Sequence, residues 1–187
     1  MTIKNDLKTK YEKEIRPALQ KELGIKNIHA VPSIEKVVIN IGLGRMSQAQ
    51  SFEEKVLPLI EKELSIVCGQ KPARAGAKKS IAGFKLRQGQ VIGLKVTLRG
   101  SKMYGFIDKI IKIVLPRTKD FRGLNLKNVD KAGNFNIGFK EQVVFPEIEQ
   151  DISTVDFGMQ ATVVPTIKKR NESIIMYKKL GFLFKKQ

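Results

Sequence analysis

Cysteine and histidine occur once each, as Cys68 and His29, and tryptophan is absent. A single cysteine cannot form an intrachain disulfide. One cysteine and one histidine cannot complete a zinc site, so no metal site is predicted. Cys68 lies in the apolar stretch 64–68 and is expected to be a small buried hydrophobe. A catalytic Cys–His dyad is formally possible, but His29 stands just before Val31-Pro32, where we expect the chain to enter a strand.

Long apolar runs are also missing. No stretch approaches the roughly 18 residues that a membrane-spanning helix needs. Residues 1–6 lack the apolar core of a secretory signal peptide. Hydrophobic residues nevertheless make up 42% of the 187 residues, enough for a core that needs no disulfide or metal. We therefore expect one cytoplasmic domain over residues 1–187.

Acidic residues are scarce relative to basic ones. The chain has 18 Asp and Glu against 35 Lys and Arg, a net charge of +17. Such a chain seeks polyanions, either nucleic acid or an anionic membrane surface. Residues 64–107 contain no acidic residue at all. The cations in this span are Lys71, Arg74, Lys78, Lys79, Lys85, Arg87, Lys95, Arg99 and Lys102. Because no local acid compensates them, the partner is expected to supply the anions.

Catalytic constellations are missing as well. Glu53, Glu54, Glu61 and Glu63 have the spacing of a solvated helix surface. The acids of residues 147–151 could in principle bind magnesium for a nuclease, but they have no basic neighbours for a nucleic-acid substrate. Two alternatives to RNA binding stay open. Metal-dependent RNA cleavage would identify a nuclease, and binding to anionic liposomes would identify a membrane-surface protein.

Two strands are predicted by alternation. In residues 34–41, Val37, Ile39 and Ile41 share one face, and Lys36, Val38 and Asn40 share the other. In residues 91–99, apolar side chains alternate with Lys95, Thr97 and Arg99. Gly93 lies on the polar face of this second strand and leaves room for close approach by another backbone. Each strand therefore has a mixed polar and basic face that could contact RNA or simply face solvent.

The remaining pattern is mainly helical. Helices are predicted over residues 7–23, 52–67, 102–115 and 166–181, and further strands near 135–145 and 159–164. Pro17 and Pro58 are expected to disturb their helices, and Pro116 to end the third one. Residues 71–80 are predicted to be a small, basic, mobile loop. The order of elements indicates an α+β fold with a mainly antiparallel sheet.

Several motifs follow one another along the chain. They are Val31-Pro32, Glu35-Lys36, Asn40-Ile41-Gly42, Gly69-Gln70-Lys71-Pro72, the block 78–89 (KKSIAGFKLRQG), Ile92-Gly93, the block 95–100 (KVTLRG), Pro116-Arg117, the block 120–124 (DFRGL) and Phe145-Pro146-Glu147-Ile148. In this order and spacing they closely resemble bacterial large-subunit ribosomal protein five, the family that binds 5S ribosomal RNA. The resemblance covers nearly the whole chain.

The resemblance implies a fold and a function. The fold would be an antiparallel sheet with helices packed on one face, the other face binding 5S rRNA. The protein would be a structural constituent of the large ribosomal subunit, in the central protuberance, located in the cytoplasm within the ribosome. Its further partners would be 23S rRNA, P-site tRNA and small-subunit ribosomal protein thirteen across an intersubunit bridge. No catalytic residue, cofactor or metal is implied.

The resemblance also assigns residues. Those facing 5S rRNA would be Lys36, Asn40, Gln70 and Thr97, joined by Arg99 on the polar face of its strand, and those of a tRNA-contacting loop over residues 73–80 would be Arg74, Lys78 and Lys79. Alternation independently places Lys36 with Asn40, and Thr97 with Arg99, on polar faces. The sequence departs from the family at Gly76, where a basic residue is frequent, and at Leu183, where proline is frequent.

Overall fold

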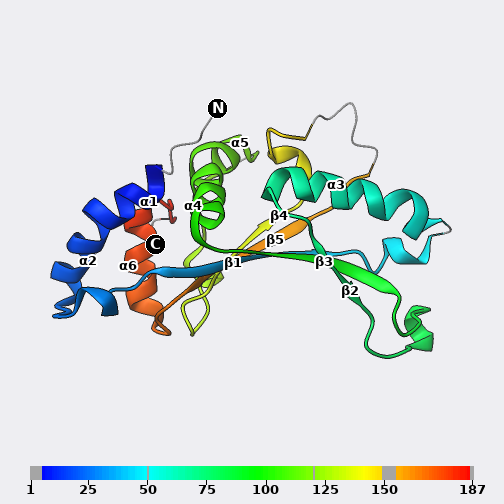
Figure 1. Ribbon diagram of the computed structural model, residues 1–187, viewed down its shortest axis with the longest axis horizontal. Coiled ribbons are helices and arrows are strands. Elements are labelled where there is room, and N and C mark those ends of the chain that lie inside the picture. Colours follow the sequence, from blue (N-terminus) through cyan, green and yellow to red (C-terminus); the bar gives the residue numbers. More distant parts are fainter. Residues whose placement is uncertain (1–5, 50, 120, 149–154, 186–187) are drawn as a thin grey trace. The chain divides into compact units, whose positions relative to one another are not determined.

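A computed structural model describes residues 6–49, 51–119, 121–148 and 155–185 (Figure 1). The strands are β1 (Ile34–Gly42), β2 (Ala73–Gly76), β3 (Val91–Leu98), β4 (Phe135–Phe139) and β5 (Met159–Pro165). They form one antiparallel sheet in the order β2-β3-β1-β5-β4. The predicted α+β fold with a mainly antiparallel sheet is therefore confirmed.

The chain divides into two compact units. The first comprises Met1–Val37, Leu98–Ile137 and Thr162–Gln187, and the second comprises Val38–Thr97 and Gly138–Ala161. Strands β1, β3, β4 and β5 each contribute residues to both units.

The second unit builds its core between strands and one long helix, α3 (Leu57–Cys68). Ile39 and Ile41 of β1 and Leu94 and Val96 of β3 are buried, as the alternation predicted. The apolar side of α3 is buried as well, and Cys68 is 6% exposed, as expected for a small hydrophobe. Each fully buried aliphatic side chain of this kind contributes about 1.5–3 kcal/mol to stability.

The first unit is mainly helical. Its helices are α1 (Asp6–Lys10), α2 (Arg16–Leu23), α4 (Gly100–Lys109), α5 (Leu115–Arg117) and α6 (Arg170–Leu180). The buried Tyr177 hydroxyl lies 2.9 Å from the Gly133 carbonyl oxygen and 3.1 Å from that of Val163. The Tyr11 hydroxyl donates to the Pro32 carbonyl oxygen at 2.7 Å, and burial raises the pKa of Tyr11 to about 12. These bonds satisfy the polar ends of aromatic side chains inside an apolar core.

Three prolines stand inside long helices, each just after a π-helical turn. The turns are η1 (Tyr11–Ile15), η4 (Phe52–Val56) and η6 (Ile110–Val114). The residue before each proline, Arg16, Leu57 or Leu115, donates its N–H five residues back rather than four. Proline lacks an N–H and clashes with the carbonyl four residues back, so a locally wider helix accommodates it. Pro116 therefore does not end its helix, which continues to Arg117.

Among the described residues, short 3-10 turns connect these elements. They are η3 (Met46–Gln48), η5 (Ala82–Phe84), η7 (Leu126–Asn128) and η8 (Gln142–Val144). A further one, η2 (Ile28–Ala30), precedes β1.

Three predicted segments need correction. Residues 73–76 form the edge strand β2 and not a loop, because they pair with β3. The strand predicted over residues 135–145 ends at Phe139. The buried Gln142 side chain donates to the Val155 carbonyl oxygen at 2.8 Å and accepts from the Phe157 N–H at 3.0 Å, which holds the chain in a turn there. The last helix begins at Arg170 and not at residue 166.

Candidate nucleic-acid interface

The outward faces of β1 and β3 carry the predicted polar residues. Lys36 and Val38 are half-buried and Asn40 is exposed, whereas Val37, Ile39 and Ile41 between them are buried. On β3, Lys95 is exposed and Thr97 half-buried between buried apolar neighbours. The face assignments made from alternation are confirmed for these residues, whereas Arg99 lies beyond the end of β3 and precedes α4.

Gly93 brings the backbones of β3 and β1 together. A Cβ at this position would lie 2.8 Å from the Ile41 carbonyl oxygen, closer than real side chains come. The predicted close approach by another backbone is therefore confirmed, and the approaching backbone belongs to β1. Because glycine has no side chain, nothing protrudes from the outward face of these two strands at this point.

Gln70 and Thr97, two of the residues assigned to 5S rRNA, lie next to each other. The Gln70 side-chain amide donates to the Thr97 carbonyl oxygen at 3.4 Å, and Gln70 is exposed. Gln70 follows Gly69, which ends α3 in the left-handed conformation with a φ of 63°. The turn after α3 thus places an amide at the edge of β3 beside Thr97, where its remaining hydrogen-bonding groups are available to a ligand.

The two assigned cations, Lys36 and Arg99, stand in the first unit. The Lys36 ammonium donates to the Glu35 carboxylate at 3.2 Å, so part of its charge is already compensated. Arg99 is exposed and directly precedes α4.

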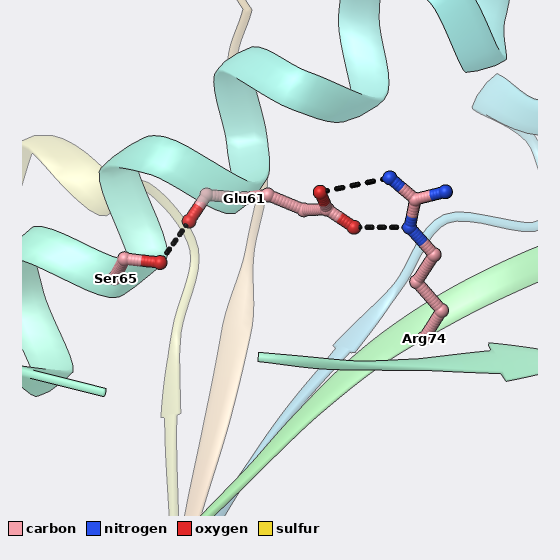
Figure 2. A network of polar contacts seen from close by, with 3 residues as sticks. All are labelled: Glu61, Ser65 and Arg74. Carbon is pink, nitrogen blue, oxygen red and sulfur yellow. Dashed lines mark hydrogen bonds and ion pairs between the residues drawn. The ribbon is translucent and has the colours of Figure 1, made fainter. Parts of the chain in front are cut away.

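Arg74 does not belong with the outward residues. The register pairs Arg74 with Leu94, while Ala73 pairs with Lys95 and Ala75 with Gly93. Paired residues share a face, so Arg74 lies on the buried side with Leu94, where α3 packs. Its guanidinium donates two hydrogen bonds to the Glu61 carboxylate of α3, at 2.5 and 3.0 Å (Figure 2).

This ion pair is two-pronged and partly buried. The Glu61 side chain is only 14% exposed, against 55% for Arg74. The hydrogen bond from Arg74 holds the pKa of the Glu61 carboxyl below its usual value. One helical turn on, the Ser65 hydroxyl donates to the Glu61 carbonyl oxygen at 2.6 Å (Figure 2). The pair joins the edge strand β2 to α3, and the Arg74 charge is thereby partly compensated by an acidic residue that precedes the acid-free span.

The segment between β2 and β3 is an ordered hairpin tip. The Ala77 N–H donates to the Gln90 carbonyl oxygen at 2.8 Å, and the Gly89 N–H donates to the Ala77 carbonyl oxygen at 2.9 Å. Further out, Ile81 and Leu86 exchange two backbone hydrogen bonds, at 3.0 and 3.2 Å, around the turn η5. Residues 78–87, which we call the hairpin tip, therefore contain backbone hydrogen bonds of their own and are not an irregular loop throughout.

The hairpin tip exposes both apolar and basic side chains. Phe84 is 65% exposed and Ile81 is 46% exposed. The exposed cations around them are Lys78, Lys79, Lys85 and Arg87. The Gln48 side-chain amide donates to the Phe84 carbonyl oxygen at 3.0 Å and ties the hairpin tip to η3. Phe84 lies in the motif Ala82-Gly83-Phe84, but the sequence alone did not indicate it as a candidate for binding. Its exposure depends on the conformation of the hairpin tip.

Two more strands add polar outward residues that received no assignment. On β4 and β5, the Thr162 hydroxyl donates to the Asn136 side-chain oxygen at 2.7 Å. Exposed Gln160 alternates with buried Met159 and Ala161. Alternation in both strands indicates these outward positions. The strand predicted near 135–145 extended beyond Phe139, so its faces were not assigned from the sequence.

The Asp, Glu, Cys and His side chains are the groups that could hold a metal ion or act in catalysis. Within residues 6–49, 51–119, 121–148 and 155–185, no three His, Cys, Asp or Glu side chains lie close enough to hold a metal ion. The acids at 149–151 lie outside the described residues. His29 is exposed, with its Nδ1 3.4 Å from the Arg16 guanidinium. Among the described helices, none has the length and apolar character required to span a membrane.

Known proteins resemble this chain over nearly its full length. A family model described as "Ribosomal protein L5" matches residues 27–87, and a second model, which describes the C-terminus of the same ribosomal protein family, matches residues 91–184. "Large ribosomal subunit protein uL5" of Thermosipho melanesiensis is 50% identical over 181 residues, covering 97% of each chain. The protein of the same name from Thermus aquaticus is 48% identical over 180 residues, covering 96% of this chain and 97% of its own. "Large ribosomal subunit protein uL5c" of Tetradesmus obliquus is 46% identical over 178 residues, covering 95% and 97%. These matches confirm the resemblance seen in the motifs, and the chain belongs to the L5 family of large-subunit ribosomal proteins.

Proposed function

We propose that this chain, a structural and non-enzymatic constituent of the large ribosomal subunit, binds 5S rRNA through the outward faces of its strands. The family gives its location, the cytoplasmic ribosome. The observation that carries the proposal is the composition of those faces. Among the residues that alternate along the outward side of the described strands, none is Asp or Glu. Glu35, near the start of β1, is exposed but alternates with the buried-face residues Val37 and Ile39, and its carboxylate lies 3.2 Å from the Lys36 ammonium. The outward residues are Lys36, Val38 and Asn40 of β1, Ala73 and Ala75 of β2, Gly93, Lys95 and Thr97 of β3, Asn136 and Gly138 of β4, and Gln160, Thr162 and Val164 of β5.

Such a face suits an RNA backbone. Glycine and alanine let sugars and phosphates approach the sheet closely, and Lys36 and Lys95 can neutralise phosphates. Asn40, Gln70 and Thr97 can hydrogen-bond to phosphates, 2′-hydroxyls or base edges. The two compact units would act together as one RNA-binding domain over residues 1–187, with Arg99 adding charge beside α4.

The P-site tRNA contact is proposed for the hairpin tip. Lys78 and Lys79 keep the role assigned to them, whereas Arg74 serves the fold through Glu61. Phe84 and Ile81 add an exposed apolar surface on which an unpaired base or the end of a base stack can pack. The backbone hydrogen bonds of the hairpin tip reduce the conformational entropy that is lost when the hairpin tip binds a partner.

Two further partners complete the proposal. 23S rRNA would contact basic surface of the first unit. Small-subunit ribosomal protein thirteen would meet the sequence between Lys140 and Met159, which carries five acidic residues and no basic one. A basic, RNA-binding partner protein fits an acidic segment of this kind better than RNA does.

The test is selective binding to 5S rRNA by the purified chain. If roughly six phosphates are neutralised, affinity falls by about a thousandfold between 50 and 200 mM salt. An unrelated structured RNA of similar length is the control, because it measures the nonspecific electrostatic part alone. Equal affinity for both RNAs at every salt concentration would contradict specific 5S recognition.

A further inference from the structure

Burial does not hold the hairpin tip (residues 78–87) in place. Leu86 is half-buried, and every other residue of the hairpin tip is exposed. The two backbone hydrogen bonds between Ile81 and Leu86 shape the turn itself, but they join the hairpin tip to no other element. Because hydrophobic burial is the main force that holds one segment on another, the direction of the hairpin tip must depend on other contacts.

The stem that connects the hairpin tip to the sheet is irregular. The register between β2 and β3 shifts between Ala75 and Gly76. A Cβ on Gly76 would lie 3.1 Å from the Gly89 carbonyl oxygen, and Gly89 itself has a φ of +86°. A register shift of this kind bends and twists a strand pair, and two neighbouring glycines add no side-chain packing to it. The stem is therefore the point about which the hairpin tip can turn.

Two glutamine side chains tie the hairpin to the turn η3. The Gln48 side-chain amide donates to the Phe84 carbonyl oxygen at 3.0 Å, and the Gln90 side-chain amide donates to the Ser47 carbonyl oxygen at 2.7 Å. The Gln90 side-chain oxygen also accepts from the Arg87 N–H at 3.1 Å. Among the hydrogen bonds of the described residues, that of Gln48 is the one that joins the hairpin tip to an element outside the hairpin.

The turn η3 is a firm anchor for these bonds. Ser47 is 6% exposed, and its hydroxyl donates to the Gly44 carbonyl oxygen at 3.0 Å while its N–H donates to the Leu43 carbonyl oxygen at 2.8 Å. Leu43 is fully buried, and its own N–H donates to the Ile92 carbonyl oxygen of β3 at 2.8 Å. The two glutamines therefore connect the hairpin to a point that the sheet and its core hold in place.

A hollow of about 690 Å³ separates the hairpin from the segment 47–54. Glu53 and Glu54 line it from that segment, and Lys85 and Arg87 line it from the hairpin. Within the described ranges of the chain, none of these four side chains forms an ion pair. Opposite charges that face the same hollow attract each other. A hairpin released from η3 thus has both the space to move and a charge attraction that draws it inward.

We propose that Gln48 and Gln90 form a latch that fixes the direction of the hairpin tip. Without the latch, the hairpin tip closes onto the hollow, and its basic side chains pair with the acids there instead of with RNA. The inference rests on the proposed tRNA contact, because the latch keeps Lys78 and Lys79 directed away from the protein's own acids. Gln48 and Gln90 are positioning residues, since their amides bind protein carbonyl oxygens and not RNA.

Distances between two spin labels in the purified full-length chain test the latch directly. One label is placed at Gly83→Cys in the hairpin tip, where a Cβ meets nothing within 4 Å, and the other at Lys62→Cys, an exposed position of α3 in the same unit. Cys68 is buried and takes up little label. Gln48→Met and Gln90→Met keep the length of the side chain but remove its donor. The matched control is Gln88→Met, because Gln88 is exposed and its side chain forms no hydrogen bond among the described residues.

Each lost hydrogen bond should shift the balance between latched and closed hairpins by about two- to tenfold. We therefore expect added shorter distances in Gln48→Met and Gln90→Met, and the wild-type distribution in Gln88→Met. Unchanged distributions in both latch variants, or the same change in the control, would overturn the latch.

Assembled ribosomes test its consequence. Gln48→Met should speed tRNA dissociation from the P site by about two- to tenfold and leave 5S rRNA binding within about twofold of wild type. Adding Glu53→Gln and Glu54→Gln should bring dissociation back toward the wild-type rate, because the hollow then no longer attracts the hairpin cations. The same pair of changes in the wild-type background should have little effect, and failure of the rescue would refute the charge attraction.

The failure of the latch and that of the proposed tRNA contact are distinguishable. If joint replacement of Lys78 and Lys79 by alanine speeds tRNA dissociation but Gln48→Met does not, the latch has no positioning role. If the lysine replacements leave tRNA dissociation unchanged, the proposed tRNA contact is wrong, and the spin-label distances alone decide whether the latch exists.

Discussion

Replacing Gly93 by alanine should open the contact between β1 and β3. The new Cβ would lie 2.8 Å from the Ile41 carbonyl oxygen, against the 3.4 Å at which ordinary contact begins, so the two strands must separate by about 0.6 Å (3.4 − 2.8). Neither group can rotate away, because the obstacle is backbone and Ile41 is 1% exposed. Overpacking of this kind costs about 1–3 kcal/mol of unfolding free energy. For a chain of this length that corresponds to a drop in Tm of about 2–12 °C.

Gly138 provides the matched control. It also lies in a strand, its φ is not positive, and nothing lies within 4 Å of a Cβ built on it. Gly138→Ala should therefore stabilise the fold by about 0.4–1 kcal/mol, because alanine restricts the unfolded chain. Thermal and guanidinium unfolding of both variants would show whether the free energy of unfolding falls in Gly93→Ala and rises in Gly138→Ala.

The same substitution tests the link from packing to binding. Asn40 and Thr97 stand on the two strands that Gly93→Ala pushes apart, so affinity for 5S rRNA should fall at a temperature where the variant is fully folded. If Gly93→Ala and Gly138→Ala had the same stability, the close approach would not govern this part of the sheet. If stability fell but 5S affinity did not, the β1–β3 face would not be the binding surface.

Three further outcomes are expected. Lys36→Ala or Thr97→Ala should each weaken 5S rRNA binding by about 1–3 kcal/mol with little change in Tm. Filter binding measures the affinity and calorimetry the Tm. A large loss of Tm with unchanged affinity would contradict the face assignment. Joint replacement of Lys78 and Lys79 by alanine should speed tRNA dissociation from the P site, while 5S rRNA is still incorporated into the subunit. Arg74→Ala should instead lower the Tm and leave tRNA dissociation nearly unchanged. The reverse pattern would refute this division of roles. All three tyrosine hydroxyls have a raised pKa because they are buried, so folding favours their protonated forms and this stabilisation is lost as pH rises above about 10. Absorbance titration should accordingly show no tyrosinate near pH 10 in the folded chain, and ionisation should coincide with unfolding.

The sequence predicted the parts of the fold that depend on local alternation. Val37, Ile39 and Ile41 are buried, and Lys36 and Asn40 point outward, because period-two patterning determines faces wherever one side of a sheet is covered. Gly93 was informative for a similar reason, since a glycine amid β-branched residues signals a close neighbour.

What the sequence did not predict depends on partners distant in the chain. The segment Ala-Arg-Ala-Gly has little strand propensity, and β2 exists because β3 offers it an edge. In the sequence Arg74 has no acidic residue nearby, and only the strand register shows that it lies on the side of the sheet that α3 covers. Gln142 ends β4 through bonds to Val155 and Phe157, which no pattern around residue 142 reveals.

The π-helical turns have a consequence for helical phase. In a straight α-helix, residues four apart drift by about 40° per step, so a strict four-residue spacing cannot stay on one face for long. Yet Leu7, Tyr11, Ile15 and Leu19 are all buried at that spacing, with the turn η1 among them. Across η4, buried Phe52 and Leu57 are five apart, the span of the hydrogen bond that joins them. Each wide turn thus acts as a one-residue insertion that resets the apolar stripe. Deleting one residue within a turn would therefore restore α-helical hydrogen bonding and keep the later side chains on the core face, whereas closing the wide turn without a deletion would rotate every later side chain by about 100° off the core.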